Sequence, residues 1–186
     1  MKLLSLDGGG SMGIFAANVL DNVDTSKFDA IIGTSIGSFV GAIIATGLNV
    51  KLTKIFHKEM PKIFSGYSFK RFIPLCPRYS DRAINNSLRG IFDGMAMSDV
   101  KKPLFITSVN LYDEHLKVSY SGCSDDGTRM LWELVRSSTA APTYFAPFNG
   151  FVDGGIYCNN PSVAGIAALC SEFDCNVEDI EVCSIG

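Results

Sequence analysis

The sequence predicts an α/β fold, a three-layer sandwich in which a mostly parallel central sheet carries helices on both faces. Short apolar segments of strand length alternate with amphipathic segments of helix length, the order that such sheets produce. The composition supports this, since 47% of the residues are hydrophobic and 18 are glycines, which suits buried elements joined by tight turns. The 186 residues suit one domain, and we expect residues 1–186 to form it.

The amino-terminal part of the chain is predicted to contain two strands and two helices. Residues 2–6 form a buried strand, residues 7–13 a glycine loop and residues 14–23 a helix. A second short strand at residues 29–33 leads into another helix. The apolar residues of that helix recur at spacings of three and four, as a core-facing stripe requires: Ile36, Phe39, Val40, Ile43 and Ile44.

The rest of the chain is predicted from prolines, strand-forming residues and one capping pair. Gly47 is placed to end the preceding helix, and residues 51–92 are expected to form helices broken by Pro61, Pro74 and Pro77. Residues 130–138 are predicted to be helical, and Asn160 can cap a helix that begins at Pro161. Strands rich in Phe, Ile, Val and Tyr are expected at residues 104–111, 115–120, 151–152 and 180–185.

Charge and hydropathy exclude several classes of protein. The net charge of −3 leaves no electrostatic footprint for nucleic acid. The apolar start of the chain is too short for a secretory signal. The longest nearly uncharged helical stretch, residues 36–48, is shorter than the roughly 20 residues of a membrane span. We therefore expect a cytoplasmic protein that is soluble or docks peripherally on a membrane.

The six cysteines include no C-x-x-C pair, and the chain has two histidines. This pattern disfavours a zinc site, and we predict neither a metal nor a cofactor. We expect buried free thiols in a reducing compartment, with disulfides as the alternative.

A candidate nucleophile lies between the second strand and the helix that follows it. Residues 33–37, Gly-Thr-Ser-Ile-Gly, match the pattern G-x-S-x-G, in which a sharp turn lifts the serine hydroxyl clear of the backbone. The flanking glycines remove Cβ atoms that would clash in such a turn. Ser35 is therefore the predicted nucleophile, and a glycine-rich turn without chemistry is the alternative.

The loop after the first strand is a candidate anion site. Residues 7–13, Asp-Gly-Gly-Gly-Ser-Met-Gly, can free backbone N–H groups to point at an anion. A phosphate would imply a nucleotide site, but neither nucleotide-binding glycine motif is complete. With a nucleophile on the next strand, we expect Gly8, Gly9 and Gly10 to form an oxyanion hole.

A serine nucleophile needs a base, and the two histidines are poor candidates. His57 lies among lysines, which disfavour its protonation, and His115 lies in a polar turn. Asp153 instead follows a short strand and precedes two glycines, and sites in open α/β sheets form at the carboxyl ends of strands. Burial beside nearby phenylalanines would raise its pKa from about 3.9 toward that of a useful base: Phe145, Phe148 and Phe151.

Taken together, these segments resemble the patatin-like phospholipase family. The resemblance runs from residue 3 to residue 161 and rests on an oxyanion loop, a nucleophile elbow and a third block, at residues 4–10, 33–37, 138–145, 151–155 and 159–161. It implies a Ser35–Asp153 dyad and calcium-independent hydrolysis of acyl esters in phospholipids, lysophospholipids or neutral lipids.

The chain departs from the family pattern at two places. The family loop usually carries arginine or lysine where this chain has Met12, which bears more on phospholipid preference than on hydrolysis. The chain also ends on the strand that the family follows with another glycine turn. We therefore expect a minimal or carboxyl-terminally trimmed version of the domain.

A basic and aromatic segment is the candidate contact with lipid. Residues 51–82 hold eight lysines and arginines against one glutamate and one aspartate, with aromatic residues interleaved. This combination is typical of segments that find anionic headgroups and insert, although a solvated face over core aromatics has the same composition. The residues expected to face substrate or membrane are Phe64, Phe69, Lys70, Arg71 and Phe72.

Two other functions stay open at this point. An acyltransferase could use an activated acyl thioester, with Ser35 acylated and His115 as base. A catalytically dead hydrolase fold could be retained for binding lipid or protein. A nucleotide-binding domain ranks third, because its motifs are absent.

Overall fold

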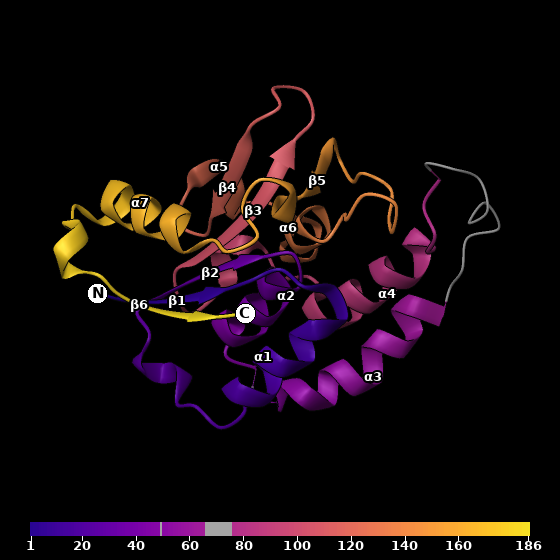
Figure 1. Cartoon of the computed structure of the whole chain (residues 1–186), viewed down its shortest axis with the longest axis horizontal. Coiled ribbons are helices and arrows are strands. Elements are labelled where there is room, and N and C mark those ends of the chain that lie inside the picture. The colour runs from indigo at the N-terminus through magenta and orange to yellow at the C-terminus, as the bar shows by residue number, and fades with distance from the viewer. Residues whose placement is uncertain (49, 66–75) are drawn as a thin grey trace.

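The computed structural model describes residues 1–48, 50–65 and 76–186, which form a sheet with helices on both faces (Figure 1). The main strand order is β4-β3-β2-β1-β6, and β5 pairs with β3 beside that path. Strands β6, β1, β2 and β3 are parallel, whereas β4 and β5 run antiparallel to β3. The bounds are β1 Lys2–Leu6, β2 Ala30–Thr34, β3 Leu104–Asn110, β4 Leu116–Tyr120, β5 Phe151–Asp153 and β6 Glu181–Ile185. The predicted fold class is confirmed.

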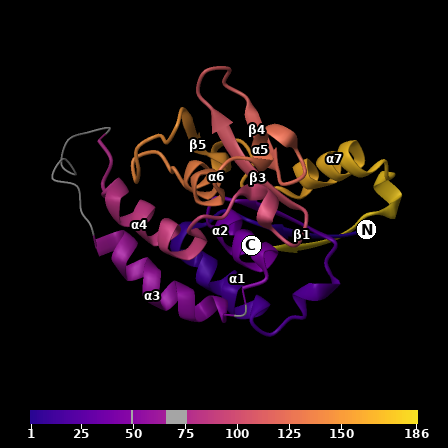
Figure 2. The ribbon, with the colours of Figure 1, turned by 180° about the vertical axis from the view of Figure 1, so that it is seen from behind.

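The helices are distributed unequally between the two faces. In the described part of the chain, α1, α2 and α6 lie on one face with α3 and α4 packed against them, whereas α7 packs on the other face. Figure 1 and Figure 2 show α7 on the opposite side of β1 and β6 from α1 and α3. The bounds are α1 Gly13–Leu20, α2 Ile36–Thr46, α3 Leu52–Ser65, α4 Asp81–Phe92, α5 Ser124–Gly127, α6 Leu131–Ser138 and α7 Ser162–Phe173.

Alternation along the strands divides the apolar residues between two cores. In β1, Leu4 and Leu6 belong to the larger core under α2, and Leu3 belongs to the smaller core under α7. In α2 the predicted stripe is buried except for Ile44, which is half-buried, and Phe39 is edge-on to Phe56 of α3 and Phe92 of α4. The helix ends at Gly47, which adopts the left-handed conformation as predicted.

The position of β5 differs from the expectation for Asp153. A strand antiparallel to its neighbours normally ends at the opposite edge of the sheet from theirs. Strand β5 is short, however, and it occupies the part of β3 that extends beyond the end of β2. Thr34, the last residue of β2, pairs with Thr107, and Asp153, the last residue of β5, pairs with Ser108. The two strands thus approach each other end to end along one edge of β3.

Three local predictions were wrong. Pro61 lies inside α3 rather than at a break, because it is exposed near the end of the helix, where water can satisfy the carbonyl that loses its donor. Helix α1 stops at Leu20, and Asp21 instead accepts hydrogen bonds from the Leu52 and Thr53 amides at the start of α3. Helix α7 begins at Ser162, one residue later than predicted, although Asn160 makes the predicted capping contact, since its side chain accepts from the Ser162 amide.

Two further observations bear on compartment and membrane. The six cysteines are free thiols, but they are not buried as expected, since five are half-buried and Cys183 is exposed. Across the described ranges, no helix has the length and hydrophobicity that crossing a membrane requires.

Candidate active site

Ser35 lies at the tight turn that joins β2 to α2. Its φ of 54° and ψ of −123° are unusual for a residue with a side chain, which marks a strained turn. Its carbonyl accepts hydrogen bonds from the Ser38 amide and hydroxyl. The turn lies against the end of β1, where a Cβ atom on Gly37 would come within 2.2 Å of the Leu6 carbonyl oxygen.

Gly37→Ala is expected to lower the free energy of unfolding by about 2–3 kcal/mol, because backbone atoms of β1 cannot move away from the added methyl group. The matched control is Gly90→Ala in α4, where no atom lies within 4 Å of the added Cβ. That change should be neutral or stabilise the helix by up to about 1 kcal/mol. Urea denaturation of both variants measures the difference, and equal stabilities would show that the turn is not tightly packed.

The hydroxyl of Ser35 points at the carboxylate of Asp153. The Ser35 Oγ donates to Asp153 Oδ2 over 2.5 Å, and the Gly155 amide donates to Asp153 Oδ1 over 2.7 Å. Asp153 is 6% exposed, and this burial raises the pKa of its carboxyl group even though both hydrogen bonds act to lower it. A raised pKa and a direct hydrogen bond to the hydroxyl are properties of a general base.

Three hydroxyl side chains to which the sequence analysis gave no role lie next to this pair in the chain or in space. The buried Ser138 hydroxyl, at the end of α6, accepts the Ser35 amide hydrogen over 2.9 Å. The hydroxyls of Thr34 and Thr107 share a hydrogen bond of 2.7 Å beneath the turn. Ser138 opens the third block of the family resemblance, so its position in that block was the one available signal.

The glycine loop lies beside Ser35, but its three glycines are not equivalent. The Gly8 amide donates to the Asn159 carbonyl over 3.0 Å, and the Asn159 side chain donates back to the Gly8 carbonyl over 3.3 Å. Gly9 and Gly10 line the cavity with Ser35, and in the described ranges their amides have no acceptor. The amides available to an anion are therefore those of Gly9 and Gly10, whereas Gly8 anchors the loop.

A cavity of about 830 Å³ lies in front of the pair, within the range of small-molecule sites. Ser35, Asp153 and Gly155 line it together with residues of α2, α3 and α4 and the loop after α6. Its helical walls are almost entirely apolar, formed by Phe39, Met60, Ile63, Phe64, Ile84 and Leu88. This lining suits an extended hydrocarbon chain.

Among the described residues, those predicted to face substrate or membrane, and the two histidines, do not contribute to the Ser35–Asp153 pair. Phe64 lines the cavity and packs edge-on against Tyr79 at 5.1 Å, so it belongs to the wall. The predicted positions Phe69, Lys70, Arg71 and Phe72 lie outside the described residues. His57 and His115 are exposed, and neither is among the cavity residues.

Of the three phenylalanines expected to bury Asp153, one lines the cavity with it and the other two pack elsewhere. Phe145 is buried and lines the same cavity as the carboxylate. Phe148 packs edge-on against Trp132 at 5.6 Å, and the guanidinium of Arg129 lies 5.5 Å from the ring of Phe151.

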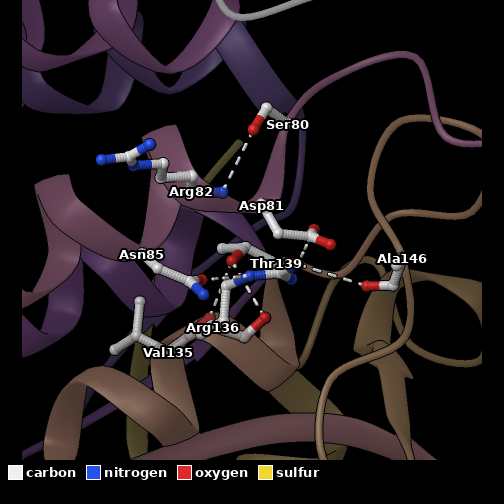
Figure 3. Close-up of polar contacts among 8 residues, drawn as sticks. All are labelled: Ser80, Asp81, Arg82, Asn85, Val135, Arg136, Thr139 and Ala146. Carbon is white, nitrogen blue, oxygen red and sulfur yellow. Dashed lines mark hydrogen bonds and ion pairs between the residues drawn. The ribbon is translucent and has the colours of Figure 1, made fainter. Parts of the chain in front are cut away.

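A buried guanidinium links elements next to the cavity, and Figure 3 shows its contacts with Asp81, Asn85 and Ala146. Arg136 of α6 has no exposed surface; its Nη2 lies 2.5 Å from Asp81 Oδ1, and its Nε donates to Asn85 Oδ1 over 2.9 Å. The guanidinium also lies 5.4 Å from the ring of the wall residue Phe145. Arg136 thus joins the start of α4 to the loop that lines the cavity.

The site combines a serine in a tight turn, a buried aspartate that accepts its hydrogen bond, a glycine loop and an apolar cavity. This arrangement is typical of α/β proteins of the serine acyl hydrolase class. The sequence profile of the patatin-like phospholipase family matches residues 4–164, and the chain belongs to this family.

Several relatives align with most of this chain. A cGAMP-activated phospholipase of Vibrio cholerae is 26% identical, over 100% of this chain and 64% of its own length. The mouse 85/88 kDa calcium-independent phospholipase A2 is 27% identical, over 90% of this chain and 23% of its own length. A probable inactive patatin-like protein of Arabidopsis thaliana is 24% identical, over 100% of this chain and 60% of its own length. The chain therefore spans less than two thirds of the length of these relatives.

The fold also matches a solved structure. The crystal structure of VipD from Legionella pneumophila aligns with 99% of this chain and 49% of its own, with a TM-score of 0.65 and 16% identity. At this identity the match supports the fold alone.

Proposed function

We propose that the protein hydrolyses acyl esters of lipids, with Ser35 as nucleophile and Asp153 as its base. The observation that carries this proposal is the 2.5 Å hydrogen bond from Ser35 Oγ to the buried Asp153 carboxylate at the wall of an apolar cavity. Membership of the patatin-like phospholipase family supports the same reaction.

In the proposed reaction, Ser35 Oγ attacks the ester carbonyl carbon while Asp153 takes the hydroxyl proton. The tetrahedral intermediate collapses as Asp153 returns the proton to the leaving alcohol, which leaves an acyl-serine. A water molecule, deprotonated by the same carboxylate, then attacks the acyl carbon. The second tetrahedral intermediate collapses with cleavage of the bond to Ser35 Oγ, which regains the proton from Asp153, and the fatty acid is released. The hydrogen bond to Gly155 holds the second carboxylate oxygen, which keeps Oδ2 directed at the nucleophile.

The glycine loop supplies the electrostatic part of the proposal. Gly9 and Gly10 line the cavity beside Ser35, and their amides would donate to the oxyanion. Each well-placed donor of this kind stabilises the transition state by roughly 3–4 kcal/mol. The link between Gly8 and Asn159 fixes the loop before substrate binds, so little reorganisation is required.

The substrate class follows from the cavity and from the relatives. Apolar side chains of α2, α3 and α4 would bind the acyl chain and leave the headgroup at the opening. The matched relatives from Vibrio cholerae and mouse are named as phospholipases, which favours a phospholipid, and the mouse protein is named as calcium-independent. We propose the same independence here. His115 is exposed and outside the cavity, so nothing in the structure favours the acyltransferase.

Covalent labelling tests the proposed nucleophile. A fluorophosphonate probe should label wild-type protein once per chain at Ser35, and the Ser35→Ala variant should lose both the label and the hydrolysis of a short-chain ester and of phospholipid vesicles. Unlabelled wild-type protein that binds vesicles without hydrolysing them would instead support the alternative of a catalytically dead fold. The plant relative named as a probable inactive patatin-like protein is an example of that kind.

We also propose that the protein is cytoplasmic and that residues 51–82 contact anionic membranes peripherally. Within the described residues, Lys54 and Lys58 are exposed on α3, whose apolar residues Ile63 and Phe64 line the cavity. Attraction of this kind is screened by salt. Binding to anionic vesicles that is equally strong at low and at high salt would contradict it.

A further inference from the structure

We propose that the opening of the cavity is a docking surface, formed by three loops that carry no charged residue of their own, that seats on a lipid surface without needing anionic headgroups. The inference deepens the proposed function, on which it rests, because it identifies the surface through which the site reaches lipid. Its residues are not those of the basic segment at residues 51–82, although Arg78 of that segment lies 5.8 Å from the ring of Tyr144, and the proposed contact is apolar rather than electrostatic.

Residues that line the cavity and are also exposed mark its opening. They come from three separate loops, namely residues 9–11 before α1, residues 142–144 after α6 and residues 156–159 before α7. Two large apolar side chains are among them, Tyr144 with 43% of its surface exposed and Ile156 with 53%. Solvent therefore meets the cavity between these three loops.

The chain around all three loops lacks charge. Residues 8–20, 137–152 and 154–171 contain no Asp, Glu, Lys, Arg or His. Segments of this combined length would hold about nine charged residues at the chain's average of 19%. From residue 137 to residue 171 Asp153 alone belongs to these types, and it is buried in the site. An ordinary solvated surface would carry charges here.

Large apolar side chains project from the same segments. Met12 follows the cavity residue Ser11 and is 71% exposed, and Phe15, one helical turn further on, is 58% exposed. We call Met12, Phe15, Tyr144 and Ile156 the apolar rim. Exposed apolar groups near the opening of a site mark a contact surface, because covering them removes apolar area from water.

A lipid surface fits the rim better than another occupant does. Charged side chains would resist leaving water, and their absence matches a surface without net charge, such as phosphatidylcholine. The rim adjoins the cavity, whose walls are apolar, so an acyl chain could pass from the lipid layer to Ser35 without crossing water. A second copy of the chain is the competing occupant, which the experiment below distinguishes.

The test uses Phe15→Asp and Phe15→Asn, which change a rim residue outside both the cavity lining and the glycine loop, and Val177→Asp as a matched control. Val177 is 62% exposed in the turn at Val177–Asp179, outside the three uncharged segments. We expect each rim variant to bind phosphatidylcholine vesicles at least about tenfold more weakly in co-sedimentation, at low and at high salt alike. Hydrolysis of a soluble short-chain ester should stay at the wild-type rate, and the control should match wild type in both assays.

Three results separate the outcomes. Unchanged vesicle binding by both folded rim variants would overturn the docking surface and leave the hydrolase proposal intact. A change of oligomeric state in sedimentation velocity, with vesicle binding unchanged, would overturn it in favour of a second copy. Absence of ester hydrolysis and of fluorophosphonate labelling in the wild type would defeat the proposed function instead. Circular dichroism and thermal melting of each variant establish that it is folded.

Discussion

Asp153→Asn is expected to lower kcat for a soluble short-chain ester by about 10³–10⁴-fold. An asparagine at this site can keep both contacts, with its Oδ1 accepting from the Gly155 amide and its Nδ2 donating to Ser35 Oγ. The hydroxyl of Ser35 would then face a hydrogen-bond donor and could no longer transfer its proton. The loss should therefore fall on the chemical step, with KM little changed.

Steady-state kinetics measure this effect, with Asp93→Asn as the control. Asp93 is exposed after the end of α4, so its amide variant should retain wild-type kcat. Hydrolysis by the wild type should also fall at acidic pH, along a limb displaced above 3.8, because burial raises the pKa of Asp153. A kcat within about tenfold of wild type would mean that another group acts as base.

The same pKa shift has a consequence for stability, and its sign is opposite to that of activity. A carboxyl whose pKa is higher in the folded state binds its proton more tightly there, so ionising it costs folding free energy. This cost to folding is absent at a pH below the pKa that Asp153 has in the unfolded chain. It grows as the pH rises to the pKa of Asp153 in the folded protein, and it is constant above that pH. Asp153→Asn should accordingly be more stable than wild type at neutral pH while being far less active.

Asp81→Ala is expected to lower the free energy of unfolding by about 3 kcal/mol, the lower end of the range for breaking a buried ion pair. The substitution leaves the guanidinium of Arg136 without its carboxylate in a place with no solvent exposure. Arg136 already has one nitrogen, Nη1, for which the described residues provide no acceptor. Burial lowers the pKa of this guanidinium, and Asp81 opposes that effect.

Removing the other partner should cost less. Arg136→Met replaces the guanidinium by an apolar chain of similar length beside Phe145 and Phe148. Asp81, whose side chain is 44% exposed, can then turn to water, so we expect a loss of only about 1 kcal/mol. Urea denaturation of both variants, with exposed Asp93→Ala as control, measures the asymmetry. An Arg136→Met variant that is less stable than Asp81→Ala would show that the hydrogen bonds of Arg136 matter more than its charge.

Much of the fold and the centre of the site could be predicted from sequence because they depend on local patterns. The stripe of α2, the left-handed Gly47 and the glycines around Ser35 each follow from neighbouring residues. The pairing of Ser35 with Asp153 could be proposed because histidines were scarce and the family motifs occur in order, and the structure places the two side chains in contact.

The remainder depends on pairings between distant segments. Nothing local to residues 151–153 indicates that β5 runs antiparallel to β3 or that it continues where β2 ends. Likewise, the Ser138 hydroxyl and the Asn159 carbonyl became part of the site through contacts across more than 100 residues. The burial of Arg136 is similar, because an arginine in an amphipathic helix would ordinarily face solvent.

Because β2 and β5 meet end to end on β3, Ser35 and Asp153 are positioned by the sheet, whereas much of the cavity wall is formed by helices. One edge of β3 sets the distance between the proposed nucleophile and the proposed base, since Thr107 and Ser108 are adjacent residues. Much of the apolar cavity wall, by contrast, belongs to α3 and α4, which follow α2 between β2 and β3. We therefore expect changes in α3 and α4 to alter the acyl-chain length that the proposed hydrolase accepts while the distance between Ser35 and Asp153 stays the same.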